Sequence, residues 1–294
     1  QNPAVVHRPN VRTPSTFRWH LRWACASIKK LRDIHSNVDG VEVQQGTWNR
    51  LKDLLPCEAC VAGKLRKFHH TRPSEFFPIE SLATRAQSTN AIDEVGREQN
   101  DIVSVDWGIV LSECRKKNTV FALYVDAAIG LVDAFPTPSR GCAGDTLQQY
   151  IQKWGVPKTI LADNAKEFLE GDFKKICAEK GINQKFSPPY SPNFNPAERW
   201  MAIITEGARS MIYISGLDPN QFWSDAVVHR AHLQLYIPLP GRKTPFELAT
   251  GERANVAHIR IFGCEALSYI EKDKRFKFDP KTEKCIYLGH SDIH

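Results

Sequence analysis

The sequence lacks the features of a membrane-spanning or secreted protein. None of its apolar runs approaches the roughly 18 uncharged residues that a membrane helix needs, and the first twenty residues contain no apolar signal core. Internal repeats and low-complexity tracts are also absent. Because the chain has no initiator methionine, we expect it to be a segment of a longer protein. With 42% apolar and 24% charged residues, the 294-residue chain is expected to form a soluble globular domain of ordinary size with a smaller addition.

The eight cysteines are too dispersed for a disulfide framework. They lie at positions 25, 57, 60, 114, 142, 177, 264 and 285. Only Cys57 and Cys60 form a close pair, with the C-x-x-C spacing of one half of a tetrahedral zinc site. This usage favours a reducing compartment and a metal half-site. C-x-x-C is also a redox motif, but no thioredoxin-like strand and helix surround it here.

Most of the chain carries no net charge, although the total is +6. Residues 1–80 contain 13 Lys and Arg against 7 Asp and Glu, whereas residues 81–294 contain 26 of each. Such a basic region is expected where a protein contacts a polyanion, and a solvated basic face is the alternative. Lys64, Arg66 and Lys67 follow the cysteine pair and are candidate contacts to DNA phosphates, which would give affinity without sequence choice.

The order of apolar and polar stretches indicates three blocks and a connector. Residues 15–70 contain two short helical patterns, at 26–34 and 47–55, and are predicted to form a small helical zinc-binding domain. Residues 71–100 are mostly polar and are predicted to be a linker. Residues 101–215 are predicted to form the main domain. The remainder, 216–294, is predicted to be a helix followed by a small extension that contains short strands.

The main block begins with strands and continues with strands and helices in alternation. Strands are predicted at 101–107, 119–135 (a hairpin interrupted by Gly130), 156–163 and 182–188. Helices are predicted at 144–155, 171–181 and 196–215. This order predicts an α/β domain with a mixed sheet.

Three acidic residues stand at the ends or starts of these elements. Asp106 and Asp163 are expected at the ends of two strands, and Glu198 in the first turn of the long helix. If the strands are neighbours, both aspartates emerge at one edge of the sheet, where ligands gather. Three converging carboxylates repel one another unless a cation holds them, and such oxygen ligands suit Mg²⁺. Two ions roughly 3.5–4 Å apart would support phosphoryl transfer.

Each acid also has a purely structural interpretation. An Asp at a strand end often caps a turn, and Asn164 beside Asp163 fits that role. In SPPYSPNFNPAERW, Asn195 is a good N-cap and Pro196 suits the first helical position. Glu198 falls three residues after that cap, where it can reach back to a free backbone N–H. Capping and metal ligation do not exclude each other.

The series of motifs resembles the integrase of copia-type retrotransposons, over about residues 17–290. VDWG resembles the block with the first acid, LADNAKEF the second (usually D-N-G-G-E-F), and SPPYSPNFNPAER the third. FWSDAV, KTPFEL and IFGCEA resemble the segments that follow the core in this family. The resemblance implies an RNase H-like mixed five-stranded sheet flanked by helices, with a C-terminal α+β extension. It also implies that Asp106, Asp163 and Glu198 hold Mg²⁺ or Mn²⁺.

The chain departs from the family pattern at three places. The loop before Glu198 is one residue shorter than is usual. Ala165 and Lys166 replace paired glycines, which predicts a less permissive turn. Trp200 stands where a basic residue often follows the Glu-Arg pair, which would weaken contact with the DNA end.

The resemblance also indicates the second half of the zinc site. Copia-type integrases have W-H-x-R-L-G-H upstream of the cysteine pair, and this chain has WHLRWAC. By this match His20, Cys25, Cys57 and Cys60 would form a closed, structural zinc site. The alternative is a partly buried His and a Cys that packs as an apolar residue. Rival ligands in the same block are His35, His69 and His70. A block this small has little core, so the metal would supply much of its folding energy.

The function implied by the resemblance is polynucleotidyl transfer. Such an enzyme joins the 3′ ends of element DNA to target DNA, acts as a homo-oligomer and works in the nucleus. Lys166 and Arg199, beside the acids, are further candidate phosphate contacts, although they could also simply balance charge. The residues alone imply only metal-assisted phosphoryl transfer. An RNase H-like nuclease and a degenerate or domesticated remnant that binds DNA or a partner are the alternatives. No membrane association or small-molecule cofactor is expected.

Overall fold

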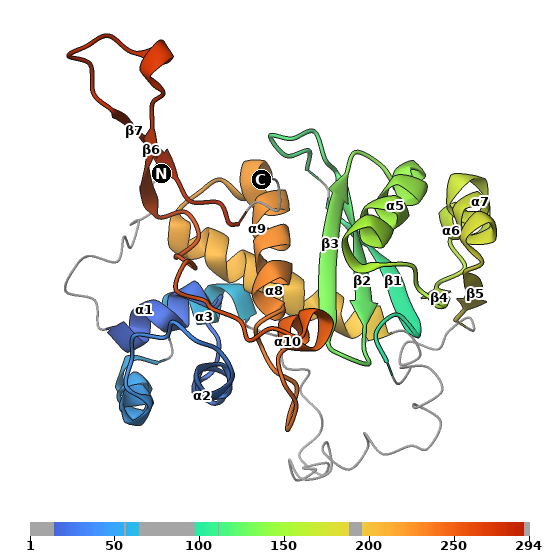
Figure 1. Ribbon diagram of the computed structural model, residues 1–294, viewed down its shortest axis with the longest axis horizontal. Helices are drawn as coiled ribbons and strands as arrows, with labels where there is room; N and C mark the ends of the chain where they lie inside the picture. Colours follow the sequence, from blue (N-terminus) through green and yellow to red (C-terminus); the bar gives the residue numbers. More distant parts are fainter. Residues whose placement is uncertain (1–14, 56, 65–97, 111, 188–195, 291–294) are drawn as a thin grey trace, which may run out of the picture.

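The computed structural model describes residues 15–55, 57–64, 98–110, 112–187 and 196–290. Figure 1 shows a central sheet with helix α5 on one side and helices α8 and α9 on the other. The N-terminal helices pack beside α8, and a two-stranded hairpin projects from the rest of the molecule (Figure 1). Within the described residues, no helix is long and apolar enough to cross a membrane.

The main sheet contains five strands in the order β3-β2-β1-β4-β5. Their bounds are Ile102–Ile109 (β1), Val120–Asp126 (β2), Leu131–Thr137 (β3), Thr159–Ala162 (β4) and Asn183–Phe186 (β5). β1, β2 and β3 pair antiparallel, whereas β4 runs parallel to both β1 and β5. A mixed sheet with this order and polarity is the RNase H-like arrangement, so the predicted fold class is confirmed.

The predicted hairpin forms because its first strand is apolar except at its last residue and its turn contains a glycine. Every residue of β2 is buried, which places this strand at the centre of the core. Gly130, at the turn into β3, has φ +75°, a conformation that residues with a Cβ rarely adopt. A Cβ at this position would also lie 2.9 Å from Cγ of Leu239.

The helices of the main domain follow the predicted pattern. Their bounds are Ala143–Trp154 (α5), Lys166–Leu169 (α6), Gly171–Lys180 (α7), Pro196–Ser215 (α8) and Pro219–Gln234 (α9), with a short 3-10 turn at Arg140–Cys142 (η3). Gly155 and Gly181 end α5 and α7 with positive φ. Asp218 caps α9, because its carboxylate accepts a hydrogen bond from the backbone N–H of Asn220.

The N-terminal block consists of short helices that pack on the main core. They are α1 (Ser15–Arg22), α2 (Ile28–Asn37), η1 (Gln45–Leu54) and α3 (Glu58–Lys64). The helical pattern at 47–55 forms a 3-10 helix rather than an α-helix. Trp48 and Leu51 are both fully buried, and residues three apart lie one above the other in a helix with three residues per turn.

Contacts between distant segments join the N-terminal block to the rest of the chain. Gly63 of α3 approaches Ser210 of α8 so closely that no Cβ would fit there. The backbone N–H of Asp39 donates to Ala254 O at 2.8 Å, and the N–H of Val256 donates to Asp39 O at 2.9 Å. Trp19 and Leu31 belong to the same hydrophobic core as the strands of the sheet. The division into domains therefore stays a prediction, and most of the predicted linker lies outside the described residues.

The C-terminal extension contains a short helix and the projecting hairpin. Its elements are α10 (Pro245–Thr250), β6 (Glu265–Tyr269), η4 (Lys272–Lys274) and β7 (Thr282–Ile286). Thr244 caps α10 by accepting a hydrogen bond from the backbone N–H of Glu247. β6 and β7 pair antiparallel, as expected for the two predicted strands, and they are exposed along most of their length.

Candidate active site and candidate metal centre

Asp106 and Asp163 come from two neighbouring parallel strands. The last pair between β1 and β4 is Ser104 with Leu161, and continuing this register by two residues brings Asp106 level with Asp163. Level side chains on adjacent parallel strands project from the same face, and such strands lie about 4.8 Å apart. The charge of Asp163 acts on Asp106, which agrees with two neighbouring carboxylates at the point where β4 ends.

The predicted position of Asp106 at a strand end is wrong in detail. β1 continues to Ile109, and Asp106 lies within it, paired with Leu123 of β2. The apolar pairing with β2 extends β1 beyond the end of β4. Asp106 is therefore held on one side by a strand and faces the end of a shorter strand on the other.

Asp106 is partly buried, and its environment makes it hard to ionise. Burial raises its pKa, the backbone N–H of Trp107 at 2.7 Å opposes this, and the charges of Asp163 and Glu198 raise it further, to about 6. Among the described residues, the charges that act on Asp106 are those of Asp163 and Glu198, both negative. Glu198, more than ninety residues along the chain, therefore lies close enough to Asp106 to share its electrostatic field.

The raised pKa of Asp106 predicts that the native carboxylate lowers the stability of the fold at neutral pH. The folded chain binds this proton more tightly than the unfolded chain does, where the pKa is about 3.9. The contribution of protonated Asp106 to the stability of the fold is thus complete below about pH 4 and is lost as pH rises through about 6. Asp106→Asn, whose amide oxygen can still accept from Trp107, should be more stable than the native chain by about 2 kcal/mol at neutral pH.

Urea unfolding without added Mg²⁺ or Mn²⁺, at several pH values, measures this difference. The two proteins should be equally stable near about pH 4, where both side chains are neutral. Asp172→Asn changes an exposed aspartate on α7 and should give a difference near zero at every pH. An Asp106→Asn variant that is less stable than the native chain at neutral pH would contradict the claim that burial and the charges of Asp163 and Glu198 disfavour an ionised Asp106.

Asp163 and Glu198 face solvent on either side of this position. Asp163 directly follows β4, and its Oδ1 accepts a hydrogen bond from the N–H of Ala165 at 3.1 Å, so it also caps the turn. Asn164 Nδ2 donates to the carbonyl of Ser187 at 3.0 Å, which joins the ends of β4 and β5. Glu198 is exposed in the first turn of α8. Its predicted N-cap partner, Asn195, lies outside the described residues.

The turn after Asp163 does not need the glycines that the family has there. Ala165 has φ −65° and ψ 139°, an ordinary extended conformation, and Lys166 begins α6. Phe168, on the same short helix, is completely buried and stacks on Trp107 with ring centroids 5.8 Å apart. This contact ties α6 to the strand that carries Asp106. The replacement of the glycines therefore causes no backbone strain in this turn, and the expectation that the turn is less permissive stays a prediction.

The three carboxylates fit a hard divalent cation. They offer only oxygen ligands, and two of them are exposed, which leaves positions for water and phosphate oxygens. Their ligand oxygens do not all lie within 4.8 Å of one another. Three negative carboxylates without a counter-ion repel one another, which favours this separation. Two divalent ions bound between the carboxylates would not require all the ligand oxygens to lie closer together.

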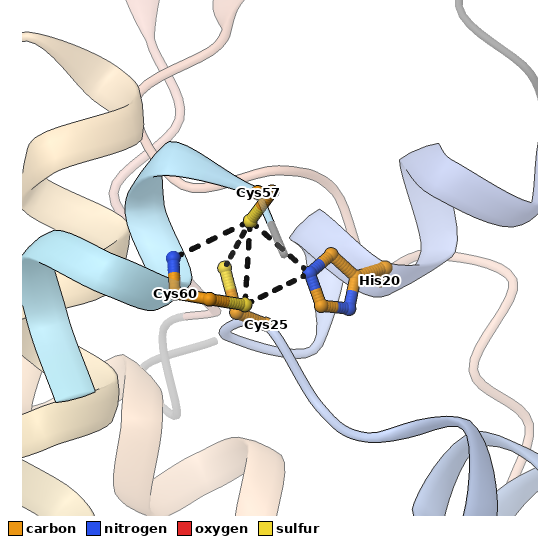
Figure 2. Close-up of side chains that lie close together, drawn as sticks. All are labelled: His20, Cys25, Cys57 and Cys60. Atoms are coloured by element: carbon orange, nitrogen blue, oxygen red, sulfur yellow. Dashed lines mark hydrogen bonds between the residues drawn. The ribbon is translucent and has the colours of Figure 1, made fainter. Parts of the chain in front are cut away.

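The four predicted zinc ligands meet in one cluster. Figure 2 shows His20, Cys25, Cys57 and Cys60 pointing toward one another from α1, the loop after it, and α3 with the residue just before it. His20 Nε2 lies 3.3 Å from both Cys57 Sγ and Cys60 Sγ, and Cys57 Sγ lies 3.3 Å from Cys60 Sγ and 3.8 Å from Cys25 Sγ. All four ligand atoms lie within 4.8 Å of one another. A tetrahedron with Zn–S bonds of about 2.3 Å has edges of roughly 3.8 Å.

The surroundings of the cluster orient its ligands for a cation. Nδ1 of His20 lies 2.8 Å from the carbonyl of Ala26, so Nδ1–H donates there and Nε2 is left for a metal. Burial lowers the pKa of His20, but hydrogen bonds to Cys57 and Cys60 raise it more, to about 9. The cluster thus favours positive charge at its centre. Cys25 reaches it because the backbone there has φ 58°.

The rival ligand His35 is used elsewhere in the structure. Its Nδ1 accepts a hydrogen bond from Nε1 of Trp48 at 3.0 Å, and the two rings pack edge to face. His69 and His70 lie outside the described residues. Among the residues that the structure describes, the cluster of His20 and three cysteines is the only group of three or more potential ligands whose atoms all lie within 4.8 Å of one another.

Comparisons with known proteins agree with the predicted origin of the chain. No protein-family model matches it. It is 26% identical over 287 residues to the retrovirus-related Pol polyprotein from transposon TNT 1-94 of Nicotiana tabacum. The chain is a homologue of Pol polyproteins. This match covers 93% of the chain and 19% of the tobacco polyprotein. A second match, 28% identical over 139 residues, covers 44% of the chain and 8% of the Gag-Pol polyprotein of gibbon ape leukemia virus.

Two solved structures illustrate the similarity in three dimensions. The HTLV-2 integrase catalytic core domain in complex with magnesium, in its dimeric form, has a TM-score of 0.43 and 20% identity, covering 53% of this chain and 99% of that one. A chain in the structure of a simian T-cell lymphotropic virus intasome in complex with the PP2A regulatory subunit B56 gamma has a TM-score of 0.46 and 16% identity, covering 87% of this chain and 86% of that one.

The predicted phosphate contacts of this Pol homologue lie in different environments. Nζ of Lys64 donates to the carbonyls of Ala24 and Cys25, at 2.9 and 2.6 Å, so it supports the loop that carries a zinc ligand. Lys166 is exposed, with only a long ion pair of 3.9 Å to Glu170, and Arg199 is exposed beside Glu198. Arg66 and Lys67 lie outside the described residues. The role of all five in binding nucleic acid stays a prediction.

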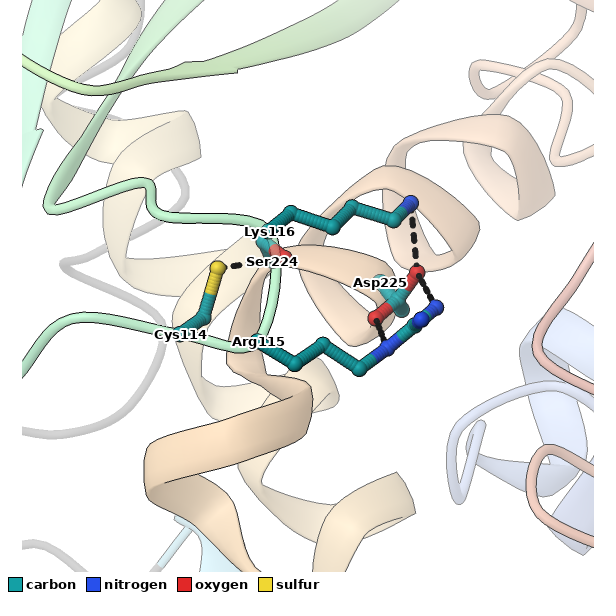
Figure 3. Close-up of polar contacts among 5 residues, drawn as sticks. All are labelled: Cys114, Arg115, Lys116, Ser224 and Asp225. Atoms are coloured by element: carbon teal, nitrogen blue, oxygen red, sulfur yellow. Dashed lines mark hydrogen bonds and ion pairs between the residues drawn. The ribbon is translucent and has the colours of Figure 1, made fainter.

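The FWSDAV motif holds the loop between β1 and β2 against α9. Trp223 Nε1 donates to the carbonyl of Ser112 at 3.1 Å, and Cys114 Sγ donates to Ser224 Oγ at 3.2 Å. Figure 3 shows Asp225 between two cations of this loop. Its carboxylate is 5% exposed and pairs with Arg115 at 3.1 Å and Lys116 at 2.7 Å. Three consecutive residues of the motif thus each fasten the same loop.

Asp225→Asn is expected to destabilise the fold. The change removes a largely buried negative charge and leaves two cations without their partner. Because both cations are partly exposed, we expect a loss of about 2 kcal/mol, below the range for a fully buried pair. Urea unfolding measures it. Glu113→Gln, which breaks an exposed pair with Lys117, is the control and should cost less than about 0.5 kcal/mol. Equal losses of stability in the two variants would show that the buried ion pairs of Asp225 contribute no more than the exposed pair of Glu113.

Proposed function

We propose that the chain is the integrase segment of a retrotransposon Pol polyprotein and catalyses metal-dependent polynucleotidyl transfer. The observation that carries this proposal is the convergence of three acids at one edge of an RNase H-like sheet. Asp106 lies on β1, Asp163 directly follows the neighbouring strand β4, and both Asp163 and Glu198 act electrostatically on Asp106. The homology to the tobacco transposon polyprotein supports the proposal.

In the proposed reaction, the 3′-hydroxyl oxygen of element DNA attacks the phosphorus of a target phosphodiester in line. A new P–O bond forms, the bond to the target 3′-oxygen breaks, and that oxygen leaves as a hydroxyl. The attacking hydroxyl loses one proton and the leaving oxygen gains one, so no oxidant or reductant is needed. Bound Mg²⁺ or Mn²⁺ would neutralise charge on the phosphate and on both oxygens. Asp106, Asp163 and Glu198 would hold these ions.

The other parts of the chain fit supporting roles in this reaction. The contact of Trp107 with Phe168 and the hydrogen bond from its N–H fix the orientation of Asp106. Lys166 and Arg199 are exposed beside the acids and would bind phosphate groups of the substrate. The zinc-binding segment would be structural, since four protein ligands leave no open position. The enzyme would act as a homo-oligomer on DNA ends, in the nucleus.

A strand-transfer assay tests the proposal. The zinc-loaded chain is incubated with a duplex that carries the element's terminal sequence, target plasmid, and Mg²⁺ or Mn²⁺. Joined products that depend on the divalent ion are the expected result. Nicked target without joining would indicate a nuclease that uses water as the nucleophile. DNA binding without joining or nicking at any ion concentration would indicate a catalytically degenerate DNA-binding remnant.

A further inference from the structure

A cavity of about 540 Å³ lies between the zinc-binding segment and helices α8 and α9. Its walls come from the loop after α1, from α2 and α3, and from both long helices, which lie side by side in Figure 1. Cavities of roughly 300–1,000 Å³ are typical of small-molecule sites. Three of the predicted zinc ligands, His20, Cys25 and Cys60, line one side of it, and its other charged or aromatic side chains are Trp23, Lys30, Lys64, Glu206 and Arg230.

Arg230 is a buried cation with few partners. It is 5% exposed, and among the described residues its guanidinium donates only to Gln234 Oε1, at 3.3 and 3.4 Å. A guanidinium has five N–H donors, and a buried charge without acceptors is costly. Arg230 crosses α8 at Gly207, where a Cβ would lie 2.5 Å from its Nε. The absence of a side chain at Gly207 thus makes room for the arginine beside the cavity.

Further donors line the same cavity. Nε1 of Trp23 is buried and has no acceptor among the described residues. The ammonium of Lys30 makes no hydrogen bond or ion pair within the described part of the chain. The charges that act on Lys30 are Arg230, Lys64 and Arg199, all of them positive. The cavity therefore presents hydrogen-bond donors and positive charge together.

The negative groups nearby do not neutralise this charge. Glu206 also lines the cavity, but its carboxylate is not among the charges that act on Lys30 or Arg230. Cys25 and Cys60 act on Lys64, which also donates to two backbone carbonyls. Lys64 is thus balanced by the metal-binding cluster, whereas Lys30 and Arg230 have no anionic partner in the described structure.

We propose that this cavity binds a small phosphorylated anion. Phosphate oxygens accept several hydrogen bonds and carry the charge that Arg230 and Lys30 lack, and the guanidinium suits phosphate in particular. A cavity of this size excludes double-stranded DNA. The bound anion would join α2 and α3 to α8, and so fix the zinc-binding segment relative to the helix that carries Glu198. This proposal stands independently of the proposed catalytic function.

Isothermal calorimetry with pyrophosphate tests the proposal on the full zinc-loaded chain. No Mg²⁺ or Mn²⁺ is added, so that the anion cannot be bound through ions at the three acids. Saturable binding is expected. Lys30→Gln should weaken it about tenfold or more, because a hydrogen bond to a charged group is lost. Lys29→Gln removes the neighbouring exposed charge on α2 and should change the affinity less than about twofold.

Two outcomes would overturn this inference. The first is the absence of pyrophosphate binding at millimolar concentration, or equal affinity in the Lys29 and Lys30 variants while circular dichroism shows both to be folded. The second is displacement of pyrophosphate by a short DNA duplex whose own affinity falls by the same factor in Lys30→Gln. That second result would make Lys30 part of a DNA backbone site instead. The experiment substitutes the exposed Lys30, so its result does not depend on a variant of the buried Arg230, which could fail to fold.

Discussion

Asp163→Asn is expected to abolish strand transfer while leaving DNA binding intact. Asp163 would hold a metal ion from the end of β4, opposite Asp106, and an amide is a far weaker ligand for Mg²⁺ than a carboxylate. A divalent ion at a transferring phosphate is worth several kcal/mol, so the rate should fall on the order of 10³-fold or more. Joined product is measured with Mg²⁺ and Mn²⁺, and DNA affinity is measured in parallel.

The choice of asparagine keeps the local structure of the native chain. Its side-chain oxygen can still accept the hydrogen bond from Ala165 that Asp163 accepts. Asp172→Asn, at an exposed aspartate on α7 outside the proposed site, is the matched control and should retain activity. If Asp163→Asn kept more than about a tenth of the native rate, Asp163 would not be a metal ligand in the reaction. Loss of DNA binding in this variant would point instead to a folding defect.

Local sequence signals predicted most elements of the fold, because the elements themselves are locally determined. Gly155 ends α5 and Pro196 begins α8, as their backbone preferences indicate. β2 is apolar at every position except its last, and every one of its residues is buried. The resemblance to retrotransposon integrases added the RNase H-like architecture with five strands in one mixed sheet, which propensity alone does not provide.

The local details that the sequence did not reveal depend on partners distant in the chain. The length of β1 beyond Asp106 is set by its pairing with β2, and no residue near Asp106 signals it. Lys64 follows the cysteine pair in a basic run, which suggested a DNA contact. In the folded chain its ammonium donates to two carbonyls of the loop that carries Cys25. That loop is about forty residues away in sequence.

The cavity beside Arg230 could not have been found by reading the sequence. Within HRAHLQ, Arg230 has the appearance of an exposed helical residue. It becomes buried because α8 packs against α9, and because Gly207 of α8 leaves it room. Glycine within a helix lowers helix stability by roughly 1 kcal/mol relative to alanine. A glycine in the middle of α8 was therefore the one available signal, and it indicates a close neighbour without identifying it.

Cys57→Ser should remove zinc and unfold the N-terminal block while the main sheet remains folded. Cys57 Sγ contacts all three other ligand atoms of the cluster. The core around it is a small cluster, separate from the main core, that includes Leu21, Ile214 and Ile261, so the metal is expected to contribute much of the stability there. We expect about one zinc per native chain, and structural zinc contributes roughly 10–16 kcal/mol of binding free energy in isolated zinc fingers.

Zinc content by mass spectrometry and hydrogen exchange by segment measure the two effects. Residues 15–64 should lose protection in Cys57→Ser, whereas β1, β2 and β3 should keep it. Cys285→Ser, at an exposed cysteine of β7 outside the cluster, should change neither measurement. Full zinc content in Cys57→Ser, or global unfolding of the sheet, would contradict a structural zinc site confined to this block.

The identity of the fourth ligand can be tested by two substitutions at one position. Cys25→Ser should lose zinc, because a serine hydroxyl does not replace a thiolate as a zinc ligand. Cys25→His should retain it, because the family has histidine at this place and imidazole is an equally suitable ligand. Cys25 has φ 58°, and histidine is among the residues that adopt this conformation more often than most. If both variants kept zinc, another group would be the fourth ligand and the match of WHLRWAC to the family motif would be wrong.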